Sequence, residues 1–307
     1  MSKVLVTGGA GFIGSHIVDR FRLAGCEVAV LDDLSSGRRE NLPSGVVLHQ
    51  MDVRSEDAAK KLVSFAPDLV VHAAAQISVR RSMDEPLVDA EINVCGVANL
   101  LSSASQLPTK PYFIFISTGG AIYGDQDTFP AAENHAIKPV SLYGLNKYVG
   151  ELYFDFWNRT SGIPFGVLRL ANVYGPRQNP HGEAGVVAIF CELLKQGKVP
   201  TIYGSGEQTR DFIYVTDVVD AVEALAKQRK HGTFNIGTGK ESSVLEIFRG
   251  LSAEFKSSSE PKFEHGRAGE QQRSVIDPSH ARNVLSWSPA TSLEQGLHKT
   301  AQWYSEI

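Results

Sequence analysis

Cysteine is scarce in this sequence, which has three in 307 residues: Cys26, Cys95 and Cys191. They stand apart in the chain, without the spacing of a disulfide framework or of thiolate metal ligands. We therefore expect buried free thiols without a function of their own. The nine histidines, among them His72 and His181, show no metal-ligand spacing either, so we expect no metal site.

Long apolar segments are also missing. No stretch approaches the ~20 residues that a membrane-spanning helix needs, and glycines interrupt the first residues before the apolar core of a signal peptide could form. The net charge of -4 shows no basic excess that would attract nucleic acid or an anionic membrane. We expect a cytoplasmic protein that acts on small molecules.

The sequence does contain a glycine-rich loop directly after a short apolar run. Residues 4–6 predict a buried strand, which leads through the loop at residues 7–14 into a helix. Gly8 permits a tight turn, Gly11 lets the backbone approach a pyrophosphate, and Gly14 allows close packing of the helix. The positive end of that helix faces the phosphates. The loop predicts a dinucleotide site with the contacts Gly8, Gly11, Phe12, Ile13 and Gly14.

An acidic residue follows the second predicted strand, at residues 27–31. Asp32 would accept hydrogen bonds from the adenosine ribose and repel a 2′-phosphate, which favours NAD over NADP. Arg38 and Arg39 lie close enough in the sequence to hold such a phosphate, although two solvated loop arginines are the simpler interpretation.

Strands and helices alternate through the N-terminal half. Further apolar strands are predicted at residues 46–49, 68–72, 112–116 and 165–168. This alternation predicts an α/β fold with a Rossmann-type, doubly wound parallel sheet. Ligands of such sheets bind beyond the carboxyl ends of the strands. Asp52 and Val53 follow one of these strands and could line the adenine.

Beyond about residue 171 the pattern becomes irregular, with proline- and glycine-containing loops between short elements. We predict an NAD-binding Rossmann domain at residues 1–170 and a smaller α/β substrate-binding lobe at residues 171–307. A segment near residues 211–238 is expected to return to the first domain, so the boundary is interleaved.

Tyr143 and Lys147 lie four residues apart in a predicted helix. Residues at this spacing share a helix face, so the ammonium can lie beside the phenol and favour its ionised form. A tyrosine near its reference pKa of ~10 is a poor base at neutral pH, and a fixed cation can bring it into a useful range. Alone, this pair fits many amphipathic helices. Together with the glycine loop, it predicts an NAD-dependent enzyme.

These features resemble the extended short-chain dehydrogenase/reductase family, and within it the UDP-glucose 4-epimerases. The resemblance covers essentially the whole chain. Besides the glycine loop and the Tyr143/Lys147 pair, it rests on residues 32–37, 72–76, 117–124, 172–178, 182–187 and 210–212.

The resemblance implies roles for the reaction residues. Tyr143 would be the base and acid at the sugar C4 hydroxyl, and Lys147 would hold the nicotinamide ribose and lower the tyrosine pKa. A hydroxyl beside the reacting oxygen is implied at Thr118 or Ser117, whereas better-known epimerases place a serine where Gly119 stands. Related dehydratases and decarboxylases carry acids at this point. Gly119 and the glycine after it offer none, so the reaction should stop at oxidation and reduction.

The resemblance also implies the ligand contacts. For NAD it adds Asp33, Ser35, Ser36, Gly37, Ala73, Ala74, Ala75 and Gln76. Asn93 could face the cofactor or the tyrosine loop, or be a surface amide. For the UDP-sugar it implies Asn172, Ala184, Gly185, Val186, Val187, Thr201, Ile202, Tyr203, Arg210 and Arg267.

The implied activity is NAD-dependent interconversion of UDP-galactose and UDP-glucose through a transient 4-keto sugar. UDP-N-acetylglucosamine, UDP-glucuronate or a UDP-pentose are alternative substrates, since Arg80, Arg81 and Arg177 could recognise a carboxylate. A non-catalytic NAD-sensing protein is a further alternative, but such proteins typically lack the tyrosine or the lysine. The resemblance also implies a homodimer built from helices at residues 86–106 and 142–160, with no nucleic acid or membrane partner.

Overall fold

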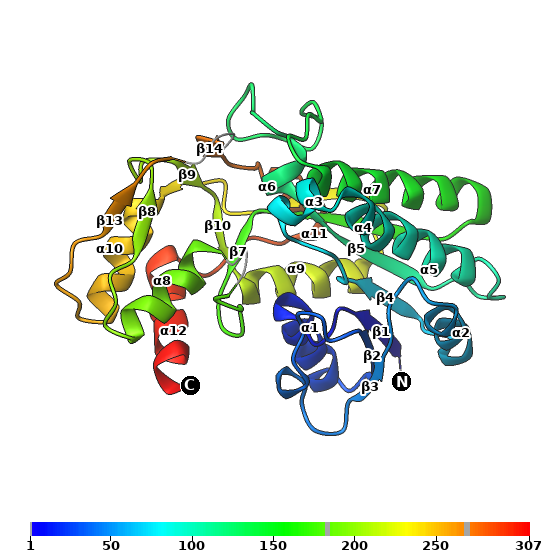
Figure 1. Ribbon diagram of the computed structural model, residues 1–307. Helices are drawn as coiled ribbons and strands as arrows, with labels where there is room; N and C mark the ends of the chain where they lie inside the picture. The colour runs from blue at the N-terminus through cyan, green and yellow to red at the C-terminus, as the bar shows by residue number, and fades with distance from the viewer. Residues whose placement is uncertain (1, 182–184, 267–270) are drawn as a thin grey trace.

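The computed structural model describes residues 2–181, 185–266 and 271–307 (Figure 1). At its centre is a seven-stranded sheet in which every neighbouring pair is parallel. In spatial order the strands are β11 (Gly232–Ile236), β6 (Phe165–Leu170), β5 (Tyr112–Thr118), β4 (Leu69–His72), β1 (Lys3–Thr7), β2 (Glu27–Asp32) and β3 (Val47–Gln50). The chain runs outwards from β1 to β3 and crosses back to β4, so the strand order reverses between β1 and β4. The predicted doubly wound α/β fold is confirmed.

Alternating side chains of the strands supply two cores, one on each face of the sheet. In β1, Val4 and Val6 pack on one face and Leu5 packs on the other. The first face is covered by α1 (Phe12–Leu23), α9 (Val215–Gln228) and α11 (Ser279–Leu285), and the second by α2 (Glu56–Phe65), α5 (Gly96–Ala104) and α7 (Leu142–Ser161). Burying a valine or leucine side chain contributes about 1.5–3 kcal/mol, so this alternation specifies the register of each strand.

The helix expected at residues 86–106 contains a π-helical turn. After α3 (Val79–Asp84), the chain forms α4 (Pro86–Ala90), the π turn η2 (Glu91–Cys95) and then α5. Such turns are frequent at functional sites. Here Asn93 is buried and Cys95 is exposed. The expectation of buried thiols is therefore wrong for Cys95, which lies on the outer side of this turn.

The remaining elements form a smaller lobe, at the left of Figure 1. Its strands are β7 (Asn172–Tyr174) paired with β10 (Phe212–Tyr214), β8 (Thr201–Tyr203) paired with β13 (Lys262–Glu264), and β9 (Thr209–Arg210) between β12 (Ser242–Ser243) and β14 (Arg273–Ser274). Helices α8 (Val186–Lys195), α10 (Val244–Glu254) and α12 (Leu293–Glu306) pack around a third core. The short helices η1 (Arg39–Asn41) and α6 (Gly119–Ile122) complete the fold.

The segment at residues 211–238 divides between the two parts. Its first strand, β10, pairs with β7, whereas α9 packs on the sheet and β11 is the edge strand beside β6. The domain boundary near residue 170 stays a prediction.

Within the three described ranges, no helix has both the length and the apolar character needed to cross a membrane. Those residues also include no group of three or more histidine, cysteine, aspartate or glutamate side chains placed to hold a metal ion.

Candidate active site

The glycine-rich loop joins β1 to α1 beside the point where the strand order reverses. Gly8 has a φ of +68°, and a Cβ there would lie 2.6 Å from the backbone nitrogen of Ala74. A Cβ on Gly14 would lie 2.0 Å from the carbonyl oxygen of Gly8, and one on Gly11 would lie 3.2 Å from it. The loop therefore presents bare backbone, followed by the positive end of α1, where Phe12 and Ile13 are partly buried. This cradle fits the pyrophosphate of a dinucleotide.

Replacing Gly14 by alanine should weaken NAD binding by about 5- to 150-fold, because relieving the Cβ clash costs about 1–3 kcal/mol. Titration of NADH by fluorescence measures this loss. Gly162→Ala is the control, since Gly162 has no atom within 4 Å of its Cβ position, and its φ of +68° strains an alanine only locally. It should lower stability slightly and leave NAD affinity unchanged. Equal NADH affinities for wild type and Gly14→Ala would contradict this assignment of the loop.

The Asp32 carboxylate is bound to the backbone around it. Its Oδ2 accepts from the N–H of Ala10 and its Oδ1 from the N–H of Leu34, both at 2.9 Å. Burial raises the pKa of Asp32, and these two N–H groups act in the opposite direction. A Cβ on Gly37 would lie 2.8 Å from Oδ1. Asp32 therefore holds the glycine loop at Ala10.

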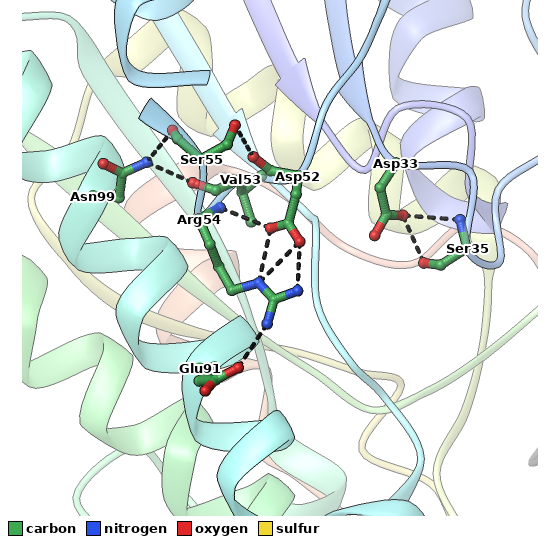
Figure 2. Close-up of polar contacts among 8 residues, drawn as sticks. All are labelled: Asp33, Ser35, Asp52, Val53, Arg54, Ser55, Glu91 and Asn99. Atoms are coloured by element: carbon green, nitrogen blue, oxygen red, sulfur yellow. Dashed lines mark hydrogen bonds and ion pairs between the residues drawn. The ribbon is translucent and has the colours of Figure 1, made fainter. Parts of the chain in front are cut away.

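Asp33, next in the chain, is exposed (Figure 2). Its Oδ1 accepts from the Ser35 N–H at 2.9 Å and from the Ser35 hydroxyl at 2.6 Å. The exposed residues that follow are Ser35, Ser36, Arg38 and Arg39. Each Asp32 oxygen accepts one backbone N–H, and the predicted ribose contact of Asp32 stays a prediction. Two carboxylates at this point disfavour a 2′-phosphate.

Asp52 and Val53 follow β3 and are held from the neighbouring helices (Figure 2). Arg54 donates from Nε to Asp52 Oδ2 at 2.9 Å and from Nη1 to Glu91 of η2 at 2.8 Å. This guanidinium lowers the pKa of Asp52. Asn99 on α5 donates to the Val53 carbonyl oxygen at 2.7 Å. The Val53 side chain is buried, so an adenine here would meet the Asp52 carboxylate and the backbone.

The loop after β4, residues Ala73, Ala74 and Ala75, lies against the glycine loop. The Ala74 N–H donates to the Thr7 hydroxyl oxygen at 3.3 Å, and His72 Nδ1 is 2.7 Å from the same oxygen. Burial lowers the pKa of His72 to about 3. His72 therefore stays neutral and supports the loop.

The Gln76 and Asn93 side chains are buried and bonded within the protein. Asn93 donates to the Gln76 carbonyl oxygen at 3.0 Å and accepts from the Gln76 N–H at 3.1 Å. Both amides also donate to Asp89 on α4, at 2.7 Å from Gln76 and 3.0 Å from Asn93. Asn93 is thus not a surface amide, and the cofactor contacts implied for Gln76 and Asn93 stay predictions.

Tyr143 and Lys147 begin α7, which Ser141 caps by accepting from the Gly144 N–H at 3.1 Å. The Tyr143 phenol is hydrogen-bonded to the side chain of Thr118 at the end of β5. Of the two hydroxyl candidates, Thr118 is therefore the one beside the phenol.

Two further glycines let α7 pack closely, one against α6 and the other against the sheet. A Cβ on Gly144 would lie 2.5 Å from the Ala121 carbonyl oxygen, and one on Gly150 would lie 2.9 Å from Phe115 Cζ. Lys147 is buried, and its Nζ lies 4.2 Å from the centroid of the Phe115 ring. A pair of glycines within a helix is the signal that could have revealed this contact.

The pKa values of the pair differ from the expectation. Burial lowers the pKa of Lys147 to about 7, while Glu151 and Asp89 act to raise it. Burial also raises the pKa of Tyr143 to about 12; the Thr118 hydrogen bond opposes this rise and Asp89 adds to it. Lys147 is not among the groups that lower the pKa of Tyr143: burial has the largest influence, and only the Thr118 hydrogen bond opposes it. The phenol needs a further cation beside it to act as a base at neutral pH.

Ser117 contacts a different partner. It is buried and donates to Glu151 Oε1 at 2.5 Å. Glu151 forms a buried ion pair with Arg169 on β6, with Nη2 and Oε2 2.6 Å apart, and Arg169 donates to the Tyr123 hydroxyl at 3.0 Å. We therefore assign Ser117 to this buried network and not to the reacting oxygen.

Gly119 and Gly120 follow Thr118. A Cβ on Gly119 would lie 2.8 Å from Ile276 Cδ1, so a serine at this position would displace the Ile276 side chain. A Cβ on Gly120 would lie 3.3 Å from Asn172 Oδ1 and 4.0 Å from Thr118 Oγ1. Asn172 therefore lies near the phenol and its hydroxyl partner, and the two glycines provide no carboxylate there.

The other substrate candidates differ in exposure. Val187 and Ile202 are buried in the third core, so only their backbone could contact a ligand. Gly185 is exposed, and the partly buried candidates are Val186, Thr201, Tyr203 and Arg210. Ala184 and Arg267 lie outside the described residues. A cavity of about 640 Å³ begins directly after Tyr203, lined by Gly204, Phe263, Glu264, His265 and Gly266.

The arginines considered for carboxylate recognition each have an acidic partner. Arg80 pairs with Asp84 at 3.6 Å, and Arg81 pairs with Glu85 at 3.1 Å. Arg177 pairs with Asp19 of α1 at 2.7 Å. A sugar carboxylate would have to displace these partners.

The sequence analysis missed Asp89, Asn146, Glu151 and Arg169. All four are buried polar residues near Tyr143 and Lys147 in the structure. Arg169 carried a usable signal, because it interrupts an otherwise apolar strand. The others lie among ordinary helix residues, and only packing distinguishes them.

Comparisons with known proteins identify the family. A sequence model described as the NAD dependent epimerase/dehydratase family matches residues 4–237. The UDP-glucose 4-epimerase of Mycolicibacterium smegmatis is 41% identical over 98% of both chains. The solved UDP-glucose 4-epimerase of Thermotoga maritima with UDP-glucose is 42% identical, with a TM-score of 0.96 over 99% of both chains. The Thermus thermophilus UDP-glucose 4-epimerase complex with NAD is 39% identical, with a TM-score of 0.92 over 98% of both chains. The chain belongs to the NAD dependent epimerase/dehydratase family.

Proposed function

We propose that this protein is an NAD-dependent 4-epimerase that interconverts UDP-galactose and UDP-glucose through a transient 4-keto sugar. The hydrogen bond between Thr118 and the Tyr143 phenol, with Lys147 one turn further along α7, carries the proposal. The named activity of the relatives supports it. Residues 1–170, with part of 211–238, would then bind NAD, and residues 171–307 would bind the UDP-sugar.

In this reaction Tyr143 takes the proton of the C4 hydroxyl while Thr118 holds the same oxygen. The glycine loop at Gly8, Gly11 and Gly14 would hold NAD+, which would supply the acceptor for the C4 hydride and a positive ring that would lower the tyrosine pKa. After the 4-keto sugar has turned over, Tyr143 returns the proton to the oxygen.

Binding energy should come mainly from the UDP part, because a hexose that turns cannot be held on all sides. UDP alone should therefore bind to the NAD-loaded protein. Calorimetry that detects no UDP binding would count against this division of the site.

The ion pairs of Arg80, Arg81 and Arg177 favour a neutral sugar over UDP-glucuronate. UDP-N-acetylglucosamine and UDP-pentoses stay as alternative substrates. The non-catalytic alternative finds no support, because the tyrosine, the lysine and the hydroxyl are all present.

The test is to incubate the NAD-loaded protein with UDP-galactose, without added reductant, and to separate UDP-glucose by chromatography. UDP-glucuronate and UDP-N-acetylgalactosamine are assayed in parallel. We expect an equilibrium mixture of the UDP-galactose pair and much slower conversion of UDP-glucuronate. Conversion of UDP-glucuronate alone would replace the proposed substrate, and no conversion of any sugar would refute the epimerase.

We also propose a homodimer built from α7 and the α4–η2–α5 helix. Leu145, Leu152 and Phe156 lie on one side of α7 at helical spacing, with 41%, 49% and 47% of their surface exposed. Leu87 on α4 is 77% exposed, and both α4 and α5 are neighbours of α7. Paired across a twofold axis, these helices would form a four-helix interface.

Leu152→Glu should convert the dimer to a monomer, because the charge would be buried at the interface. Light scattering after gel filtration measures the mass. Leu23→Glu is the matched control on α1, where Leu23 is 87% exposed, and should keep the wild-type mass. A wild-type protein that elutes as a monomer would refute the dimer directly.

A further inference from the structure

The carboxylate of Asp89 lies among three amides beneath the reaction residues. Asp89 is 1% exposed. Its Oδ1 accepts from Gln76 Nε2 at 2.7 Å and from Asn93 Nδ2 at 3.0 Å, and its Oδ2 accepts from Asn146 Nδ2 at 2.7 Å. These amides come from the loop after β4, from the π turn η2 and from α7. Asp89 therefore joins three segments that surround the site.

Backbone groups determine how two of these amides point. Gln76 Oε1 accepts from the Ser78 N–H at 2.5 Å, and Asn93 Oδ1 accepts from the Gln76 N–H at 3.1 Å. Each amide therefore presents its NH₂ group to Asp89. Asp89 Oδ1 thus accepts two N–H donors, and Oδ2 accepts a third from Asn146.

The negative charge acts on the reaction residues. Asn146 directly precedes Lys147 in α7, and the Asp89 charge raises the pKa of both Lys147 and Tyr143. The other groups that act on Lys147 are Glu151, which is paired with Arg169, and neutral His72. Asp89 is thus the negative charge near Lys147 whose hydrogen-bond partners are all neutral amides.

Burying an ionised carboxylate costs several kcal/mol, so packing alone gives no reason for an acid at this position. We propose that Asp89 is a positioning residue whose charge keeps Lys147 an ammonium and whose three amide bonds hold α7 against the cofactor loop. This inference rests on the proposed function, because it takes Tyr143 and Lys147 as the reaction residues.

Asp89→Asn tests the proposal. It removes the charge, and the Asn146 amide can turn over so that all three hydrogen bonds persist. Loss of a negative charge lowers the pKa of Lys147 and of Tyr143, so both limbs of the kcat/KM pH profile should move to lower pH. The ratio of variant to wild-type kcat/KM should therefore fall steadily from about pH 6 to about pH 9.

Asp155→Asn is the matched control, because Asp155 is an exposed acid on α7 that pairs with Arg159. The ratio of its kcat/KM to the wild-type value should stay near one at every pH. Thermal melting checks that each variant is folded, and Asp89→Ser, also neutral, should show the same slope if Asp89→Asn fails to fold.

A pH-independent ratio for folded Asp89→Asn would mean a structural role only and would overturn the inference, as would a ratio that rises with pH. If the wild-type protein converts no UDP-sugar, the proposed function itself has failed. If the wild type converts UDP-galactose but the kcat/KM ratio of Asp89→Asn to wild type does not change with pH, only the inference about Asp89 is rejected.

Discussion

Tyr143→Phe is expected to lower kcat by about 10²- to 10⁴-fold, the range that a positioned general acid and base contributes. Phenylalanine keeps the ring and loses only the hydroxyl that bonds to Thr118. Since UDP supplies most of the binding energy, UDP affinity and stability should change little. Turnover of UDP-galactose by the NAD-loaded variant, with calorimetry of UDP binding, measures both.

Tyr153→Phe is the control for this prediction. Tyr153 also lies on α7, where its ring stacks on Trp157 with centroids 5.6 Å apart, and its hydroxyl has no place in the proposed reaction. Wild-type turnover is expected for Tyr153→Phe. If Tyr143→Phe also turned over at the wild-type rate, the proton would have to move through another group and the proposed reaction centre would be wrong.

Glu151→Gln should lower the free energy of unfolding by about 3–5 kcal/mol, the cost of leaving one partner of a buried ion pair without its counter-charge. Arg169 is 5% exposed and donates three hydrogen bonds to the Glu151 carboxylate, at 3.1, 3.2 and 2.6 Å. Glutamine has nearly the same size as glutamate, so the loss of unfolding free energy measures the effect of removing the Glu151 charge. Denaturation in urea, followed by circular dichroism, measures it.

Asp155→Asn again provides the comparison, because it breaks an exposed ion pair with Arg159 on the same helix. Exposed pairs of this kind contribute about 0.3–0.5 kcal/mol. A double variant, Glu151→Gln with Arg169→Met, should recover part of the loss, since it no longer buries an unpaired cation. Equal unfolding curves for Glu151→Gln and Asp155→Asn would show that the buried pair contributes little to stability.

Features that depend on neighbouring residues could be read from the sequence. The glycine loop, Asp32 and the Tyr143/Lys147 spacing are local patterns, and each follows from backbone sterics or helix geometry. The alternation of strands and helices predicted the doubly wound sheet for the same reason, since apolar periodicity reports which faces are buried.

Features that depend on which distant segments meet could not be read in this way. Adjacent residues of a strand point in opposite directions, and only the packing of α7 on β5 shows that Thr118 meets Tyr143 while Ser117 meets Glu151. The resemblance implied the backbone of residues 184–187 and the 201–203 stretch as ligand contacts, and only the tertiary structure shows that the Val187 and Ile202 side chains lie in the core of the smaller lobe.

By itself, the sequence determined the fold class, the dinucleotide loop and the reacting pair, because short-range sterics and periodicity suffice for these. Tertiary structure alone decided the protonation of that pair. Burial raises the pKa of Tyr143 and lowers that of Lys147; the buried charge of Asp89 acts on both residues, and that of Glu151 acts on Lys147. Desolvation and long-range charge depend on what the fold brings together, so no spacing along the chain could express them.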